Sequence, residues 1–337
     1  MDKDNSNTEL REKLQGFVKQ WVEPQMQGRV IPDELLQCIH DEQYITQHCC
    51  MVTKLDTQPL CAMKDIQHIR NRITGMVISP LDKNGGMVNI MCKKRWHRLY
   101  ESVFTDAQLY KPISHGMQTE IQRQYRAYTE KGLDTVAPWN DKGELPESYF
   151  LTKDKNLEKQ RPVVTAWNHP PKQTLKVCAK GGTMLLKSAE KLKHFGITST
   201  NQVWQALWNP DMNPNNHILV SFDVKQMFTS LPHGEIEEAV LGFIQMMHAE
   251  FDTPYFHVYK ANGKYAYPGK SPCKKQAYQA TITQIWLALE FEMTNMAFQW
   301  GSLLKLMIEG LGIGGTMSPF GACALCVFKE HRWQTSI

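Results

Sequence analysis

Apolar residues recur at helical spacing in the first part of the sequence. Leu10 and Leu14 share one face of a helix, and Ile66 and Ile69 repeat the pattern further along. Such spacing buries one side of a helix and leaves its charged side in water. We therefore expect a helical N-terminal region over residues 1–74.

Shorter patterns, typical of strands, come next. Residues 77–92 place two apolar arms around a polar turn that contains Gly85-Gly86, which predicts a strand–turn–strand unit. Residues 137–161 are polar and contain prolines and glycines, which predicts a loop. A β-branched run then begins at Val163 and predicts a further strand.

The last part of the chain contains patterns typical of strands and patterns typical of helices. Tyrosines and lysines surround Asn262-Gly263, a dipeptide typical of a tight hairpin turn. Residues 276–300 carry apolar side chains at helical spacing and are expected to form one core helix. A glycine-rich turn then precedes Ser318-Pro319, which predicts a helix start because proline fits the first turn of a helix.

Composition narrows the class of protein only moderately. The chain has 337 residues, of which 42% are hydrophobic and 21% charged, as in ordinary globular proteins. Its net charge of +4 is compatible with nucleic acid as a partner but does not require it. No apolar stretch is long enough to span a membrane and no secretory signal is visible, so we expect an intracellular protein, nuclear or cytoplasmic, with no membrane partner.

The most informative carboxylate is Asp223. The apolar run Ile218, Leu219 and Val220 suits a strand, over residues 217–222, that is buried on both faces, and Asp223 stands at its end. A carboxylate buried there needs a metal ion or a basic partner. Alternatively, Asp223 simply caps a following helical turn.

Other candidate residues each have a plain structural reading as well. Lys83 beside the glycine pair and Arg161 before the β-branched run can bind phosphate, although surface cations flank many strands. The tyrosine–lysine segment around Asn262-Gly263 suits either a surface hairpin or a platform for single-stranded nucleic acid. The glycine-rich turn before Ser318 is a general type of anion site.

Four segments in a fixed order carry a more specific signal. They read, from the N-terminal side, LDKNGGMVNIM, KQRPVVTAWNHPP, SFDVKQMFTSLPHGEIEEAV and EGLGIGGTMSPFGACAL. Together they resemble the conserved segments of reverse transcriptases, in particular those of Penelope-like and related retroelements. The resemblance covers roughly residues 75–337, and the third and fourth segments are similar to motifs A and B of that family.

The resemblance implies a role for each matching position. Asp223 and the Val224 carbonyl would be ligands of two Mg²⁺ ions, and Phe228 would be the steric gate that favours deoxynucleotides. Lys83 and Arg161 would contact the incoming triphosphate. The partners would be an RNA template, a DNA primer and deoxynucleoside triphosphates. The positions expected beside the template–primer and the new base pair are Gly314, Gly315 and Ser318.

One feature of the family is missing from the sequence. The motif C hairpin, an aromatic-x-Asp-Asp segment, supplies another metal carboxylate in reverse transcriptases, yet no Asp-Asp dipeptide occurs here. The sequence ends at Ile337, within the motif B helix, so the thumb is expected to be absent. We therefore expect these 337 residues to be inactive alone and to correspond to part of a longer, catalytic parent.

These observations predict an α+β fold of the right-hand polymerase type. We expect the helical region at 1–74, fingers at 75–205 and a partial palm at 206–337. The expected function is that of a reverse-transcriptase fragment, which transfers nucleotides to a DNA primer in its parent. The alternative is a non-catalytic nucleic-acid-binding protein derived from a retroelement.

Overall fold

In the computed structural model the chain divides into two compact units, Met1–Thr74 and Gly75–Ile337, each described by itself. The predicted helices before residue 63 and the predicted strand at 217–222 lie outside the described residues. The structure describes residues 63–189, 192, 194–196, 202–203, 223–250, 253–261, 263–272 and 275–336.

The first unit contributes one described helix, α4 (Met63–Arg72). It carries Ile66 and Ile69, so the helix predicted from their spacing is confirmed. No helix in the described part of the chain is long and apolar enough to cross a membrane.

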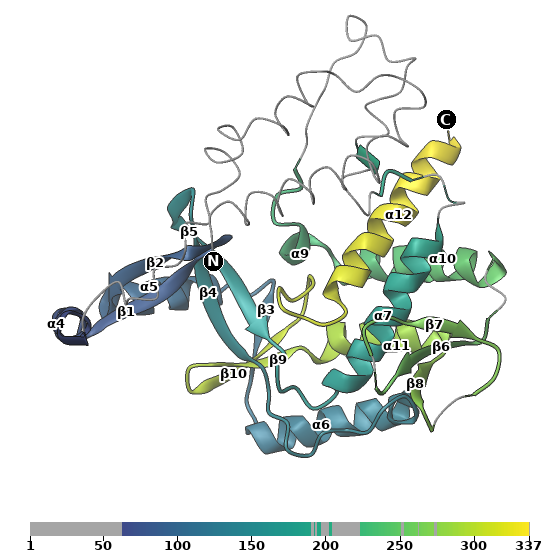
Figure 1. Cartoon of the computed structure of the whole chain (residues 1–337), viewed down its shortest axis with the longest axis horizontal. Coiled ribbons are helices and arrows are strands. Elements are labelled where there is room, and N and C mark those ends of the chain that lie inside the picture. Colours follow the sequence, from purple (N-terminus) through teal and green to yellow (C-terminus); the bar gives the residue numbers. More distant parts are fainter. Residues whose placement is uncertain are drawn as a thin grey trace, which may run out of the picture. The chain divides into compact units, whose positions relative to one another are not determined.

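The second unit mixes helices and strands, which confirms the predicted α+β class (Figure 1). Its strands are β1 (Met76–Asp82), β2 (Asn84–Cys92), β3 (Tyr110–Ile113), β4 (Glu147–Lys153), β5 (Asn156–Thr165), β6 (Tyr255–Tyr259), β7 (Tyr267–Gly269), β8 (Ala277–Ala280), β9 (Ala297–Trp300) and β10 (Leu303–Met307). Its helices are α5 (Lys93–Val103), α6 (Met117–Glu130), the short 3₁₀ helix η4 (Leu133–Thr135), α7 (Lys172–Ser188), α9 (Met227–Ser230), α10 (His233–Glu250), α11 (Ile282–Asn295) and α12 (Ser318–Ser336).

Seven strands form the larger sheet, in the order β2-β1-β4-β9-β10-β3, with β5 paired to β4. Its core is aromatic: Phe104, Phe150 and Phe298 are buried and pack with Tyr100 and its neighbours. Strands on both sides of the predicted fingers–palm boundary at residue 205 share this sheet, so the boundary does not divide it.

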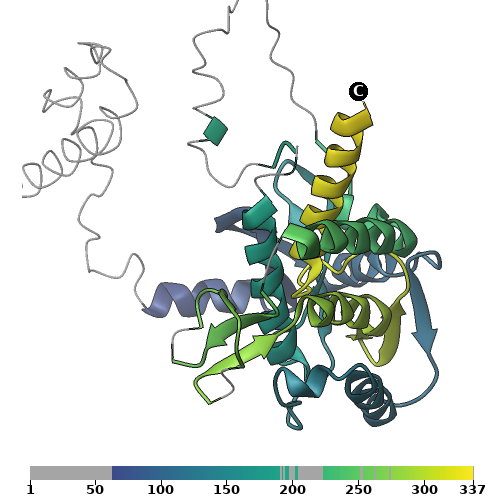
Figure 2. The ribbon, with the colours of Figure 1, turned by 90° about the vertical axis from the view of Figure 1, so that its right-hand side faces the viewer.

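A second core lies among the helices α7, α10, α11 and α12. Phe320 of α12 packs directly on Gly182 of α7, where any larger side chain would overlap the phenyl ring. A three-stranded sheet, in the order β7-β6-β8, lies beside α7 (Figure 2). Its residue Phe256 contacts α7 near Gly181 and so joins the small sheet to the helical core.

The hairpin predicted at residues 77–92 is confirmed as β1 and β2. Its turn lies earlier than the glycine pair, because Lys83 itself adopts a left-handed conformation with φ of 65°. The register then shifts after Pro80, so the glycines belong to an irregular part of β2 rather than to the turn.

Two sequence-based predictions were wrong. The predicted loop at 137–161 contains all of β4 and the first part of β5, joined by a turn at Asp154-Lys155. In β4 one of the two buried positions is the polar Thr152, and β5 begins with four exposed residues, so apolar residues do not alternate as expected of a half-buried strand.

The predicted helix at 276–300 is shorter than expected, because strands β8 and β9 occupy its two ends. The helix α11 begins after Thr281, whose side chain accepts a hydrogen bond from the Gln284 N–H while the Gln284 side-chain oxygen accepts one from the Thr281 N–H. This reciprocal capping box defines the helix start more sharply than apolar spacing does.

Candidate nucleotide-binding site

The glycine-rich loop between β10 and α12, residues 309–317, is the centre of the candidate site. Gly310 and Gly314 adopt positive φ angles of 80° and 105°, which only glycine adopts without strain. A Cβ atom at Gly314 would overlap the carbonyl oxygen of Val164 on β5. The glycines therefore let the loop lie flush against the backbone of β5.

Hydrogen bonds hold this loop on two sides. On one side, the Val164 N–H donates to the Ile313 carbonyl at 2.9 Å. On the other side, the Leu311 N–H donates to the Phe228 carbonyl at 2.6 Å. The loop thus joins β5 of the large sheet to the segment that follows Asp223.

The start of α10 provides a further anchor for the loop. The backbone N–H of His233 donates to a carboxylate oxygen of Glu309 at 2.7 Å, and the His233 ring nitrogen Nε2 lies 2.8 Å from the Gly310 carbonyl oxygen. The Glu309 carboxylate thus accepts one of the free N–H groups at the α10 N-terminus.

A buried carboxylate lies beneath the other end of the loop. Glu292 of α11 is only 3% exposed, and its two oxygens lie 2.8 and 3.2 Å from the Met317 N–H nitrogen. Burial raises the pKa of Glu292 to about 7, although hydrogen bonds from Met317 and Ser318 act in the opposite direction. Glu292 thereby fixes the point where the loop turns into α12.

The two predicted phosphate-binding cations lie on the large sheet. Arg161 of β5 donates from Nη1 to Oδ1 of Asp82 at 2.7 Å, and Asp82 precedes Lys83 at the tip of the β1–β2 hairpin. Arg161 is three residues from Val164, which is about 10 Å along a strand. Arg161 therefore belongs to the same strand as Val164, which is bonded to the glycine-rich loop, and its guanidinium is oriented by Asp82.

The motif A residues lie on an exposed segment before and within α9. Asp223 and Val224 are exposed, and Gln226 has a left-handed φ of 55°. Phe228 is half-buried and packs against the helical core while its carbonyl binds the loop. Within the described residues, no three His, Cys, Asp or Glu side chains converge as a metal site, so the metal role of Asp223 and Val224 stays a prediction.

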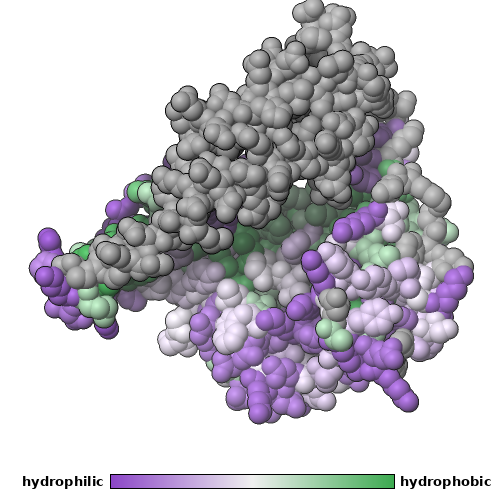
Figure 3. Space-filling model, viewed as in Figure 1, coloured by the Kyte–Doolittle hydropathy of each residue, from purple (hydrophilic) through white to green (hydrophobic). Residues whose placement is uncertain are grey.

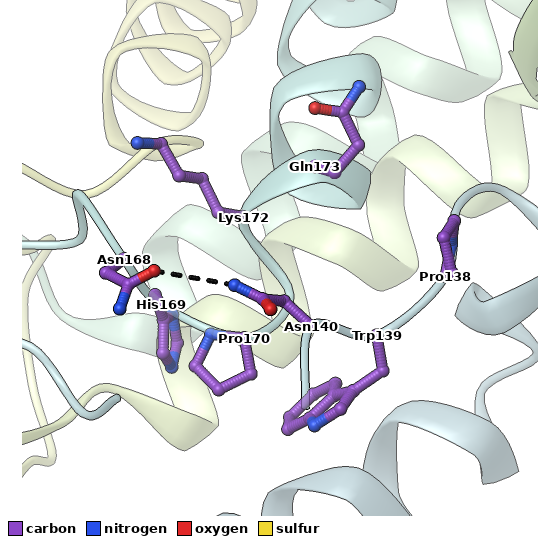
Figure 4. Close-up of a pocket in the computed structure, with 8 residues that line it drawn as sticks. All are labelled: Pro138, Trp139, Asn140, Asn168, His169, Pro170, Lys172 and Gln173. Atoms are coloured by element: carbon purple, nitrogen blue, oxygen red, sulfur yellow. Dashed lines mark hydrogen bonds between the residues drawn. The ribbon is translucent and has the colours of Figure 1, made fainter. Parts of the chain in front are cut away.

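The Asn and Pro that follow the RPVV segment have a structural role. They line a pocket of about 400 Å³ at the N-terminus of α7, where the Asn140 side chain donates to the Asn168 side chain (Figure 4). Backbone bonds from Asn140 to the Pro170 carbonyl and from Glu144 to the Asn168 carbonyl tie the preceding loop to this turn.

His169, at the same turn, is buried and its ring nitrogen Nε2 lies 3.1 Å from the side-chain oxygen Oε1 of Gln124. The amide group of Gln124 donates to Glu120, so this oxygen is an acceptor and Nε2 is the protonated nitrogen. Burial lowers the pKa of His169 to about 3, so the ring is neutral. Its other nitrogen, Nδ1, has no hydrogen-bond partner within the described residues.

Sequence reasoning missed three residues that hold the site together. His233 stands inside the quoted motif A segment, but nothing in that segment indicates its contact with Gly310. Asp82 precedes Lys83, and its pairing with Arg161 depends on strands that are distant in sequence. Glu292 is one more acid on an amphipathic helix, so its burial beneath the loop leaves no signal in the sequence.

Comparisons with known proteins bear on the fold. No protein-family model matches the chain, and no curated protein matches it. Among solved structures, apo telomerase from Candida tropicalis is similar at 11% identity, with a TM-score of 0.51 over 80% of this chain and 45% of the telomerase chain. The same organism's telomerase in complex with a TWJ fragment of telomeric RNA is similar at 11% identity, with a TM-score of 0.49 over 90% of this chain and 48% of that chain.

The chain spans about half the length of the solved telomerase chains that it matches. Telomerase is a reverse transcriptase, and the likeness to its apo structure covers most of this chain. The chain therefore has a reverse-transcriptase-like fold.

Proposed function

We propose that residues 75–337 form a nucleotide-binding region of a template-directed DNA polymerase of the reverse-transcriptase class. In its catalytic form the enzyme adds deoxynucleotides to a DNA primer on an RNA template. A retroelement origin, of the Penelope-like kind or a related one, rests on the four sequence segments. Division of the region into fingers at 75–205 and palm at 206–337 is part of the same proposal.

One observation carries this proposal. The glycine-rich loop is hydrogen-bonded both to β5, through Val164, and to Phe228, five residues after Asp223. The loop with the predicted base-pair contacts is thus bonded to Phe228, the predicted sugar gate, and to the strand that also carries Arg161. Phosphoryl transfer depends mainly on such positioning and on electrostatics.

The oxygen ligands at Asp223 and Val224 suit one magnesium ion but not two. Mg²⁺ prefers oxygen ligands and is commonly held by one or two carboxylates together with substrate phosphates. Asp223 and the Val224 carbonyl would hold such an ion, which would stabilise the charge that develops on the phosphates. Two ions about 3.5–4 Å apart need more acidic groups than Asp223 alone provides.

Nucleotide binding tests the proposed triphosphate contacts. Replacing Arg161 by Ala removes a bidentate donor, so the affinity for a fluorescent dATP with Mg²⁺ should fall about 10–100-fold. Lys83→Ala should weaken binding less, because Lys acts as a point charge. Lys111→Ala, on strand β3 at the opposite edge of the sheet, serves as the charge-matched control.

The measurement is fluorescence titration, with affinity for an RNA oligonucleotide determined in parallel. Arg161→Ala should reduce nucleotide affinity more than RNA affinity. If the Lys111 and Arg161 variants lose nucleotide affinity equally, the triphosphate role of Arg161 is refuted.

Sugar selection tests the role of Phe228. With Phe228→Ala the ratio of dATP to ATP affinity should move towards one, because the ring no longer blocks a 2′-hydroxyl. An unchanged ratio, with the fold intact by circular dichroism, would remove Phe228 from the proposal.

A second candidate function is non-catalytic nucleic-acid binding. It is favoured because no group of three or more His, Cys, Asp or Glu side chains among the described residues could hold a metal ion. We expect residues 1–337 not to extend a primed RNA template. Robust extension that disappears with Asp223→Asn would contradict this expectation and show that another carboxylate completes the site.

A further inference from the structure

The small sheet has one face towards the core and one face away from it. Phe256 and Val258 of β6 are 0% and 3% exposed and belong to the helical core. Side chains alternate along a strand, so His257 and Tyr259 point to the opposite, outer face. Tyr267 of β7 pairs directly with His257 and therefore shares that face.

Aromatic rings cover this outer face. Tyr259 and Tyr267 are 40% and 45% exposed, and their ring centroids lie 5.7 Å apart. The rings of Tyr255 and His257 are stacked with centroids 6.3 Å apart. Gly269 leaves room for the His257 ring, which a Cβ at that position would overlap. Ring nitrogen Nε2 of His257 is buried and has no hydrogen-bond partner within the described residues.

Positive charge surrounds the end of the sheet where Tyr259 and Tyr267 lie. Residues 253–280 contain five lysines and no Asp or Glu. In the loop from β6 to β7, the ammonium of Lys264 lies 5.2 Å from the Tyr265 ring centroid, and Lys187 of α7 approaches the same ring at 5.9 Å.

Helix α7 adds a second lysine beside that loop. The Nζ atom of Lys180 lies against Gly263, at 3.7 Å from the position of a Cβ atom there. Burial, and then repulsion from Lys176, lower the pKa of Lys180. The surface over this part of the molecule mixes pale and strongly hydrophilic residues (Figure 3).

We propose that tyrosines of the small sheet and of its β6–β7 loop, together with the lysines beside that loop, bind single-stranded nucleic acid; we name this surface the tyrosine face (Tyr255, Tyr259 and Tyr267 on the outer face, and Tyr265 with Lys187 and Lys264 at the loop). Exposed rings on the outer face of a sheet stack on bases, and neighbouring lysines attract the phosphates. Every base has a π-face, so the site discriminates little between sequences or between RNA and DNA. A duplex hides its base faces and binds more weakly.

This proposal does not rest on the proposed polymerase function. The tyrosine face belongs to the small sheet and its connecting loop, whereas the candidate nucleotide site is built on β5, the loop at 309–317 and the segment after Asp223. A protein ligand rich in acidic residues would use the lysines but would gain little from stacking on the rings. Substitution of rings and of charges therefore separates the two kinds of partner.

The first experiment measures fluorescence anisotropy of labelled 12-nucleotide oligouridylate and oligothymidylate with the full chain. The double variant Tyr259→Leu/Tyr267→Leu should bind both oligonucleotides weaker by roughly tenfold for each stacked ring lost. Its salt dependence should stay that of the wild type. The control is Tyr125→Leu, which removes a 46% exposed tyrosine from α6 and should change nothing.

A second double variant, Tyr259→Phe/Tyr267→Phe, keeps the rings and should retain affinity. This variant keeps the proposal testable if the leucine variant does not fold. Loss of binding by the phenylalanine variant would overturn stacking as the mechanism. Equal binding by the leucine variant and the wild type would overturn the proposal, as would tighter binding of a matched duplex. Binding lost through Arg161→Ala but not through the tyrosine variants would place the oligonucleotide elsewhere.

A further experiment measures the salt dependence of binding for the variants Lys187→Gln and Lys264→Gln, with Lys111→Gln as the control. Each should lower the slope of log affinity against log salt by about 0.7 if its ammonium neutralises one phosphate. An unchanged slope in both variants would remove the phosphate contacts from the proposal. Competition by polyglutamate as strong as that by oligouridylate would favour an acidic protein partner and overturn it.

Discussion

The two sheets of this molecule use aromatic residues in opposite ways. In the larger sheet, Phe150 and Phe298 are 2% and 0% exposed and pack with other rings in a closed core. In the smaller sheet, Tyr259 and Tyr267 are 40% and 45% exposed and flank a loop that contains Lys260 and Lys264. The same class of side chain therefore builds the fold in one place and presents a surface in the other, and burial together with neighbouring charge tells the two apart.

The contrast predicts very different effects on stability. Phe298→Ala should lower the free energy of unfolding by about 3–5 kcal/mol, because it leaves a cavity among packed rings. Tyr267→Ala should lower it by less than about 1 kcal/mol, the range of a cross-strand pair on an exposed face. Urea denaturation followed by circular dichroism measures both. Similar losses for the two variants would show that the outer face of the small sheet is part of a core.

The larger sheet also positions the glycine-rich loop, so a change at their contact should affect nucleotide binding. Gly314→Ala adds a Cβ that overlaps the Val164 carbonyl at a φ of 105°. We expect the free energy of unfolding to fall by about 3 kcal/mol, because the backbone is strained and the loop is displaced.

Gly301→Ala is the matched control, because Gly301 has a φ of 62° but no atom within 4 Å of a built Cβ. It should cost only about 1–2 kcal/mol, from the left-handed conformation alone. Binding of dATP, measured by fluorescence titration, should fall with Gly314→Ala but not with Gly301→Ala, while oligonucleotide binding at the small sheet stays unchanged. Equal effects of the two variants would mean that the loop does not depend on its contact with β5.

The last of these effects concerns pH. Because burial raises the pKa of Glu292 from 4.5 to about 7, the folded state binds a proton more tightly than the unfolded chain does. Stability from this group is complete below about pH 4.5 and is lost as the pH rises through 7, on the order of 2–3 kcal/mol between pH 5 and 8.

Glu292→Gln should flatten this dependence, since an amide does not titrate and its oxygen can still accept the Met317 N–H. Urea denaturation at several pH values compares the two proteins. A wild type that becomes more stable between pH 5 and 8 relative to Glu292→Gln would show that the loop amides outweigh the burial.

Local signals in the sequence predicted several elements correctly. The hairpin of β1 and β2 and the start of α12 at Ser318-Pro319 follow from apolar alternation and from the fit of proline to a first helical turn. The tyrosine–lysine segment is antiparallel as predicted, although β7 begins only at Tyr267 and leaves a longer connection than a two-residue turn.

Contacts between distant segments were beyond the reach of those signals. Glu292 and Met317 are 25 residues apart, and Asp82 and Arg161 are 79 residues apart. Their meeting depends on the packing of helices and the pairing of strands, which no periodicity encodes. The resemblance of four segments suggested that Arg161, Phe228 and Gly314 belong to one site, but only the structure describes the hydrogen bonds that join the glycine-rich loop to Val164 and to Phe228.

The two hydrogen bonds of the glycine-rich loop also have a mechanical meaning. Ile313 is hydrogen-bonded to β5 and Leu311 to Phe228. A shift of the β4–β5 hairpin therefore either moves the loop as well or breaks a hydrogen bond worth about 0.5–1.5 kcal/mol. The positive φ angles at Gly310 and Gly314 allow the chain to pivot on both sides of that pair of bonds. The loop thus connects two hydrogen-bonded points, and it couples the position of strand β5 to that of the segment that carries Asp223.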